Sequence, residues 1–284
     1  MGANGGQLGL DFGAGFTAKP LVRVTPARLA LWAQCPRRFR MTYLDRPTPA
    51  RGGAWAHNTL GAVVHLALRS LFELAAARRT PQAAAALVDR HWSSEGFRDR
   101  AQAAEYRDRA RGWVADYAAD LDPDVEPVGV ERWVSAPVGG LIAEGRVDRI
   151  DARGGELVIV DYKTGRHPLD TTAARDSRAL ALYATAARQL LHRPCTRVEL
   201  HHLPTGRVLA WEHDAASLRH HVEGAERATA AIEAATAGLD SGDDPEALFP
   251  PRPSSRCSTC EMRRLCPEGR AASPVLEPWA LLAP

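Results

Sequence analysis

The chain has 284 residues, of which 45% are hydrophobic and 25% are charged, and its formal net charge is +2. This composition is ordinary for a soluble globular protein, and the small net charge excludes a chain that is basic over its whole surface. The sequence shows neither an apolar run of the roughly 18 residues that a membrane span needs nor a recognisable secretory signal. We therefore expect a cytoplasmic protein with no membrane partner.

Helices dominate the first half of the predicted structure. Residues 1–20 are rich in glycine and lack hydrophobic periodicity, which predicts a disordered segment. A helix should begin at Thr25-Pro26, because threonine is a favourable N-cap and proline fits the first helical position, and it should end before Pro47. Three more helices are predicted at about 54–79, 81–94 and 99–121, so that residues 25–121 form a helical lobe.

Strands dominate the second half, where apolar residues alternate with polar ones. Strands are predicted at about 128–138, 144–150 and 156–162, the last two joined by a tight turn at Gly154-Gly155. A helix at 172–192, a hairpin of 196–203 and 207–213, and a helix at 215–238 complete a predicted core of residues 127–238. This order predicts an α/β fold with a mixed central sheet flanked by helices.

A group of charged residues follows the most apolar strand. The run 158–160 is apolar on both faces, as expected for a central strand, and Asp161 and Lys163 come directly after it. Asp148 on the preceding strand can bring a second carboxylate to the same edge. Two carboxylates are typical ligands of Mg²⁺ or Mn²⁺, and such an ion beside a lysine suits phosphodiester hydrolysis. From spacing alone, a solvated Asp–Lys pair at a hairpin end explains the same residues equally well.

Two segments resemble the core of the PD-(D/E)XK nucleases, and most closely their RecB-like branch. They read GRVDRID from Gly145 and VIVDYKTG from Val158. The resemblance implies a restriction-endonuclease-like core within a single domain, residues 21–284. It also implies that Asp148 and Asp161 bind Mg²⁺ or Mn²⁺ and that Lys163 is the catalytic lysine.

Further residues gain expected roles from the same resemblance. His65 lies in a helix similar to the one that adds an imidazole to the metal site, although a lone histidine beside an apolar stripe is usually a core residue. Glu131 resembles a strand glutamate that supports catalysis, or is an exposed edge charge. Tyr183 matches the tyrosine of a Gln-x-x-x-Tyr helix that lines the DNA path, or is a half-buried core aromatic. Ala179 replaces the glutamine, and Arg178 beside it is a candidate substitute for binding a phosphate.

The cysteines form a second motif. Cys257, Cys260 and Cys266 have the spacing of metal or cluster ligands, and Cys35 or Cys195 could supply a fourth. The segment around Cys35 resembles the N-terminal cysteine segment of iron–sulfur nucleases, such as AddB-type helicase–nuclease subunits and CRISPR-adaptation exonucleases. The resemblance implies a [4Fe–4S] cluster held by Cys35 and the three cysteines of residues 250–270. A structural Zn²⁺ and unligated thiols are the alternatives.

Arginines near both motifs predict a surface that binds DNA phosphates, although charge runs are usually solvated faces. The candidates are Arg37, Arg38, Arg146, Arg166 and Arg178. Together these features predict a Mg²⁺- or Mn²⁺-dependent deoxyribonuclease, an exonuclease on single strands or DNA ends, in DNA repair, recombination or foreign-DNA processing. Because the sequence has no ATP-binding loop motif, a separate helicase or a repair or adaptation subunit is a possible partner. A non-catalytic DNA-binding or scaffold protein on the same fold is the alternative.

Overall fold

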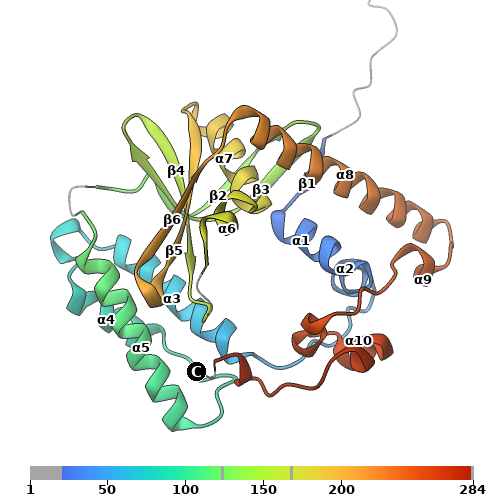
Figure 1. Ribbon diagram of the computed structural model, residues 1–284, viewed down its shortest axis with the longest axis horizontal. Helices are drawn as coiled ribbons and strands as arrows, with labels where there is room; N and C mark the ends of the chain where they lie inside the picture. Colours follow the sequence, from blue (N-terminus) through green and yellow to red (C-terminus); the bar gives the residue numbers. More distant parts are fainter. Residues whose placement is uncertain (1–20, 123–124, 167–168, 283–284) are drawn as a thin grey trace, which may run out of the picture.

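The computed structural model describes residues 21–122, 125–166 and 169–282, so the predicted disordered segment, 1–20, lies outside the described residues. Its centre is a mixed sheet of six strands with helices on both faces (Figure 1). The strands are β1 Val22–Val24, β2 Gly129–Val138, β3 Leu141–Arg153, β4 Glu156–Lys163, β5 Cys195–His202 and β6 Arg207–Glu212. The predicted α/β fold is confirmed.

Strand β3 organises the sheet because it pairs with three other strands. It runs antiparallel to β2 along one edge, from residue 141 to residue 150. On the other edge, its first residues pair in parallel with β1 and its last residues, 149–153, pair antiparallel with β4. Within the described chain, the part of this second edge between the two partners has no strand beside it. The site described below lies at this opening.

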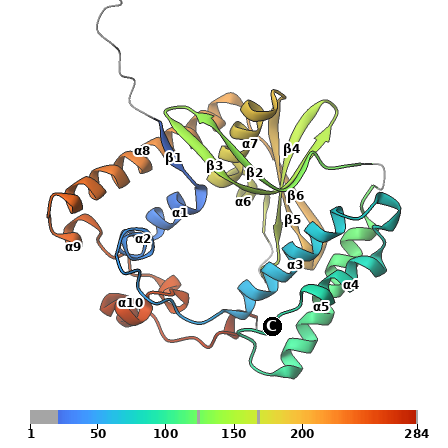
Figure 2. The same cartoon turned by 180° about the vertical axis from the view of Figure 1, so that it is seen from behind.

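Two groups of helices cover the sheet, one on each face (Figure 2). Helices α6 Thr171–Arg175, α7 Arg178–Leu191 and α8 Ala215–Asp240 lie on one face, and α3 Ala56–Phe72, α4 Pro81–His91 and α5 Arg100–Ala119 lie on the other. Ile159 of β4 packs in the first core, whereas Val158 and Val160 pack in the second. This two-sided burial is what the apolar run predicted. Nowhere in the described ranges does a helix have the length and apolar character to cross a bilayer.

The predicted first helix is divided into two. Helix α1 is Pro26–Gln34 and α2 is Pro36–Tyr43, with Cys35 between them in an extended conformation, φ −163° and ψ 108°. A residue before proline is disfavoured in the helical region, which explains the break. The predicted N-cap is confirmed, because the Thr25 hydroxyl accepts a hydrogen bond from the Arg28 N–H at 3.3 Å.

Two other predicted helices are also shorter than expected. The helix predicted at 54–79 ends at Phe72 and is followed by a short 3₁₀ turn, Ala76–Arg78. The helix predicted at 172–192 is interrupted at Asp176 and Ser177, where the Ser177 hydroxyl accepts from the Leu180 N–H and caps α7. Serine and aspartate favour such caps over helix interiors, which the apolar periodicity alone did not reveal.

The C-terminal part lies across from the sheet, and its last residues pack on the group of helices α3, α4 and α5 (Figure 1). It contains α9 Pro245–Leu248, α10 Pro267–Ala272 and 3₁₀ turns at Ser255–Thr259, Arg263–Leu265 and Ala280–Leu282. A small third core joins it to α1 and α2, with the Trp32 ring 5.5 Å from that of Phe39 and 5.9 Å from that of Phe249. The Ala56 N–H then bonds the Pro278 carbonyl at 3.1 Å, and Leu282 is buried against α3 and α5.

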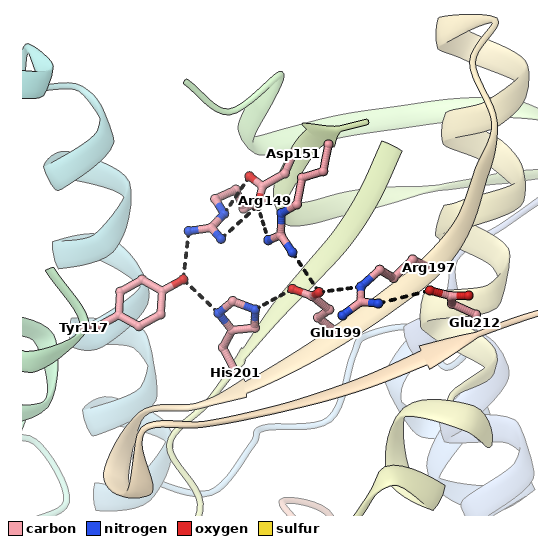
Figure 3. Close-up of polar contacts among 8 residues, drawn as sticks. Tyr117, Arg149, Asp151, Arg197, Glu199, His201 and Glu212 are labelled. Atoms are coloured by element: carbon pink, nitrogen blue, oxygen red, sulfur yellow. Dashed lines mark hydrogen bonds and ion pairs between the residues drawn. The ribbon is translucent and has the colours of Figure 1, made fainter. Parts of the chain in front are cut away.

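A buried polar network supports the strands from the α5 side (Figure 3). The Arg149 guanidinium pairs with both oxygens of Asp151 and donates to the Tyr117 hydroxyl at 2.8 Å. The Tyr117 hydroxyl is 2.9 Å from His201 Nδ1, and His201 Nε2 is 2.9 Å from Glu199. Burial lowers the pKa of His201, so a neutral imidazole accepts from the tyrosine and donates to the glutamate. The chain of donors therefore runs in one direction from β3 through α5 to β5.

Candidate functional site

Register lines up three carboxylates across three neighbouring strands. On β2 and β3, Val130 pairs with Arg149 and Arg132 pairs with Val147. Glu131, between them, therefore lies opposite Asp148. On β3 and β4, Arg149 pairs with Val160. The next residue of each strand continues this register, so Asp148 lies opposite Asp161. Opposite residues of neighbouring strands have side chains within contact distance, so the sheet itself brings these three acids together.

Glu131 has a backbone conformation that sets it apart from its neighbours. Its φ is +48°, in the left-handed region that residues other than glycine, asparagine and aspartate rarely adopt. Such a conformation typically costs about 1–3 kcal/mol and persists where the surrounding structure enforces it. Here the Glu131 carboxylate is mostly buried and pairs with Arg146 Nε at 2.7 Å. Strain of this kind at a group of acids is typical of functional sites.

Helix α3 brings His65 to the same point. His65 Nδ1 is 3.5 Å from an oxygen of Asp148 and 3.7 Å from an oxygen of Glu131. The three atoms lie within 4.8 Å of one another, which is close enough for one metal ion. The edge of the His65 ring packs against Tyr162, with ring centroids 5.8 Å apart. The structure therefore brings together His65, Glu131 and Asp148 as the tightest set of possible ligands in the described chain.

The backbone of β4 orients Asp148. Its second carboxylate oxygen accepts a hydrogen bond from the Tyr162 N–H at 2.9 Å. This bond lies just beyond Arg149 and Val160, the last paired residues of β3 and β4. Because one oxygen is held by the backbone, the other stays directed at His65. A fixed carboxylate loses less freedom when it binds an ion.

Asp161 and Lys163 form an ion pair next to this set. Burial raises the pKa of Asp161, and the negative charge of Asp148 raises it further, whereas the Lys163 ammonium lowers it. Asp161 is therefore an acid whose charge is costly until a cation approaches. Lys163 keeps 43% of its side chain exposed, so its ammonium can reach a ligand in the adjoining cavity.

The carboxylates also control the charge of His65. Burial lowers the pKa of His65, but hydrogen bonds with Asp148 and Glu131 and the nearby negative charges outweigh it and raise the pKa to about 10. In the metal-free protein at neutral pH, the imidazole is therefore protonated. A bound metal ion would take the place of that proton, since a ligating imidazole must be neutral.

Helix α7 places Tyr183 against β3. A Cβ at Gly145 would lie 2.6 Å from the Tyr183 hydroxyl, so only glycine allows this close approach. Burial and the charges of Asp148 and Asp161 raise the pKa of Tyr183 to about 12, which keeps its hydroxyl protonated. Arg178, on the same helix, instead lies against Gly224 of α8.

These residues open into a cavity of about 1120 Å³. Its walls come from the sheet, from α1, α3 and α5, and from the C-terminal segment at Leu281 and Leu282. Two predicted DNA-binding residues, Arg146 and Arg166, line it, and so does Lys163. The cavity thus combines a possible cation site with positive charge around it, as a phosphate-binding site requires.

Arg37 and Arg38 lie elsewhere. The Arg37 side chain is only 9% exposed and pairs with Glu246 and Glu268, which ties α2 to α9 and α10. Arg38 pairs with Glu261 through two hydrogen bonds, of 3.1 and 2.6 Å. Neither lines the large cavity. This placement gives both arginines a role in holding the cysteine-containing segment and does not support a direct phosphate contact by the buried Arg37.

Four of the cysteines line one small cavity, of about 50 Å³. They are Cys35, Cys257, Cys260 and Cys266. The fifth, Cys195, is buried in the core at the start of β5, and burial raises the pKa of its thiol to about 12. The break between α1 and α2 is what presents Cys35 to the C-terminal segment. The structure therefore groups the four cysteines of the sequence-based prediction and leaves Cys195 apart.

The sequence-based prediction gave Glu131 only a supporting role and gave Tyr162 none. Glu131 was expected as a supporting residue, whereas it belongs to the set of three possible ligands. Its left-handed backbone leaves no mark in the sequence. Tyr162 contributes a backbone N–H and a ring, and the only available signal was its place between Asp161 and Lys163.

The mixed sheet flanked by helices is consistent with a PD-(D/E)XK-type core. A model of the PD-(D/E)XK nuclease superfamily matches residues 23–267, so the chain belongs to this superfamily, and membership implies a nuclease with DNA as its substrate. No curated protein matches the chain. The solved structure named "Crystal structure of SSO0001" is similar at 16% identity and a TM-score of 0.36, covering 88% of this chain and 87% of that one.

Proposed function

We propose that the protein is a RecB-like nuclease that hydrolyses DNA phosphodiesters on single strands or free ends in a metal-dependent reaction. The observation that carries the proposal is the convergence of His65 with carboxylates from adjacent strands, next to the only lysine in the described chain. A surface ion pair would not need three acids and an imidazole in one place. The adjoining cavity supplies the room for a substrate.

The donors fit the expected cofactor. Carboxylate oxygens suit Mg²⁺ and Mn²⁺, and the set offers them beside one imidazole nitrogen. His65, Glu131 and Asp148 would hold the ion, and Asp161 is available beside them. When bound, such an ion polarises a phosphate and lowers the pKa of a coordinated water.

The remaining residues position the substrate and balance its charge. Lys163 can place its ammonium beside the negative charge that develops on the phosphate, a contribution of the kind worth ~10²–10³ in rate. Arg146 and Arg166 are positioned to bind phosphates of the strand that enters the cavity. The Tyr183 hydroxyl, which stays protonated, can donate a hydrogen bond near the carboxylates.

A [4Fe–4S] cluster on Cys35, Cys257, Cys260 and Cys266 is part of the proposal. Zinc is the rival, and a Zn–S bond of about 2.3 Å in a tetrahedral site requires sulfurs about 3.8 Å apart. Among the described residues, no three of these sulfurs lie within 4.8 Å of one another. The resemblance of the Cys35 segment to iron–sulfur nucleases is what favours the cluster. Its role would be structural, joining the α1–α2 junction to the C-terminal segment.

We further propose an exonuclease role in DNA repair, recombination or the processing of foreign DNA. The support is the RecB-like motif together with the cysteine set. Since no ATP-binding loop motif occurs in the sequence, a separate helicase or an adaptation subunit would supply any motor activity.

The test is cleavage of end-labelled single- and double-stranded DNA by anaerobically purified protein, with Mg²⁺ or Mn²⁺ and with chelator. Metal-dependent cleavage that is lost in Asp148→Asn protein supports the proposal. Binding of DNA without cleavage under every metal condition would instead identify the alternative, a non-catalytic DNA-binding protein. The departure at Ala179, where the family pattern has glutamine, is the one feature that favours that alternative.

A further inference from the structure

Trp133 is a large aromatic side chain that the fold leaves open. It lies on β2, 57% of it is exposed, and it lines the large cavity. Aromatic side chains are usually well buried, because each removes a large apolar surface from water. Among the described residues it is the most exposed large apolar side chain of this cavity, ahead of Leu66 at 43% and Leu281 at 36%. Its exposure inside the candidate site calls for a ligand.

The strand places Trp133 at a definite distance from the possible metal ligands. It follows Glu131 by two residues, a rise of about 6.6–6.8 Å along a strand. Glu131 lies opposite Asp148, whereas Trp133 pairs directly with Arg146. The indole therefore lies one step along the strand from the carboxylates. That step is comparable with the separation between a phosphate and the base of the neighbouring nucleotide.

Arg146 connects the two positions. Its Nε bonds Glu131 at 2.7 Å, while 63% of its side chain remains exposed. The guanidinium can therefore bind a phosphate oxygen with its remaining N–H groups. The carboxylates lie at one level of the two paired strands, and the Arg146 cation and the exposed Trp133 ring lie side by side two residues further along. In a nucleic-acid strand, one nucleotide step likewise separates the scissile phosphate from the next phosphate and its base.

We propose that Trp133 is a stacking platform for the base of a nucleotide next to the scissile phosphate of single-stranded DNA. This inference rests on the proposed function and adds a determinant of its substrate class. Stacking on an aromatic ring needs an unpaired base, and it tolerates any sequence because every base has a π-face. A base within a duplex is already stacked and paired. Trp133 therefore favours single strands and frayed ends over intact duplex.

The experiment measures binding of two labelled strands of equal length and charge. One is a short oligothymidylate, and the other has the same backbone with every base removed. Binding is measured by fluorescence anisotropy with Ca²⁺, which takes oxygen ligands as Mg²⁺ does. The preference of wild-type protein for the strand with bases reports contacts with the bases, because the phosphates are identical.

Trp133→Ala should lower that preference by about 5- to 150-fold, the range for one stacked base, and leave binding of the base-free strand unchanged. Trp133→Phe should keep part of the preference. Val275→Ala is the control, because Val275 is 77% exposed and lies outside the cavity. Circular dichroism and melting temperatures establish that each variant is folded.

An unchanged preference in folded Trp133→Ala protein would overturn the inference. So would equal losses on both strands, since these would indicate a general effect on the phosphate-binding surface. Failure of the proposed function gives a different result: wild-type protein would then cleave DNA under no metal condition, whether or not it binds either strand. The two outcomes can therefore be told apart from the wild-type measurements.

Discussion

The carboxylate site and the cysteine site are built in opposite ways. Glu131, Asp148 and Asp161 are positioned by the hydrogen-bonded register of three strands, and a backbone N–H fixes Asp148. The cysteines lie instead on short turns and a helix junction that are far apart in the chain. Within the described residues, ion pairs of Arg37 and Arg38 are prominent among the contacts that hold that region together. The first site is preformed by the sheet, whereas the second depends on contacts between segments that are distant in the sequence.

Removing one cysteine should give the largest effect. Cys260→Ala should abolish the visible absorption and the iron content of anaerobically purified protein. It should also lower the free energy of unfolding by about 3–5 kcal/mol, or the melting temperature by roughly 10 °C, because ligand binding is folding free energy at such a site. Cys195→Ser is the matched control for metal content, since Cys195 lies in the core of the sheet and does not line the cavity of the other four cysteines. Full iron content in the Cys260→Ala protein would contradict the assignment.

The carboxylate site should show the opposite behaviour, with a loss of activity and no loss of stability. Lys163→Ala should slow cleavage by ~10²–10³, about 2.7–4 kcal/mol in the barrier, because one electrostatic contact to the phosphate is gone. Its melting temperature and its affinity for DNA should stay close to those of wild-type protein. Arg227→Ala, an exposed cation on α8, is the control and should cleave normally. Undiminished cleavage by Lys163→Ala would rule out the proposed role of the lysine.

The network beneath the sheet should contribute stability only. Tyr117→Phe removes the hydroxyl between Arg149 and His201, and leaves the His201 acceptor without its donor. The expected loss is about 1–3 kcal/mol in urea-induced unfolding. Tyr43→Phe is the control, because the ring contact of Tyr43 with Arg28 survives the change. A loss of similar size in both variants would mean that the network adds nothing specific.

The smallest effect should appear as a dependence on pH. Burial raises the pKa of Glu199, but hydrogen bonds from His201, Arg197 and Arg153 outweigh it and hold the pKa well below its usual range. The stabilisation is thus fully present above the unfolded pKa, about 4.3, and is lost as pH falls toward the folded pKa. The unfolding free energy of wild-type protein should fall between about pH 6 and pH 3. In Glu199→Gln protein it should fall less steeply over the same range. Equal pH slopes in the two proteins would mean that Glu199 does not contribute to the pH dependence of stability.

Much of the fold could be predicted because local signals agree with the tertiary structure. The run 158–160 is apolar on both faces, and it is buried on both faces. Gly154-Gly155 marks a turn, and both glycines have positive φ. Strand β1 escaped prediction because Val22–Val24 is too short to show a pattern. The break at Cys35 followed from Pro36, but the continuing apolar residues concealed it.

The site could be predicted only in part because its geometry arises between elements. Asp148, Asp161 and Lys163 are recognisable from the strand motif, but the packing of α3 on the sheet decides whether His65 reaches them. The strained conformation of Glu131 depends on neighbours that no local pattern encodes. Cys35 reaches its partners through the burial of α2 against the C-terminal segment. Such long-range relations are fixed by packing and not by spacing in the sequence.

Helix α8 has a mechanical consequence for the relation between the two sites. It spans Ala215–Asp240, about 39 Å at 1.5 Å per residue, and a helix of this length is stiff. Ala225 packs in the core of the sheet and Ala235 in the small core near α2 and α9, with Ile232 touching both. The helix therefore connects the core of the sheet to the small core formed by Phe39 of α2 and Phe249. Loss of packing in the small core should therefore loosen the C-terminal part of α8, while Ala225 stays packed in the core of the sheet.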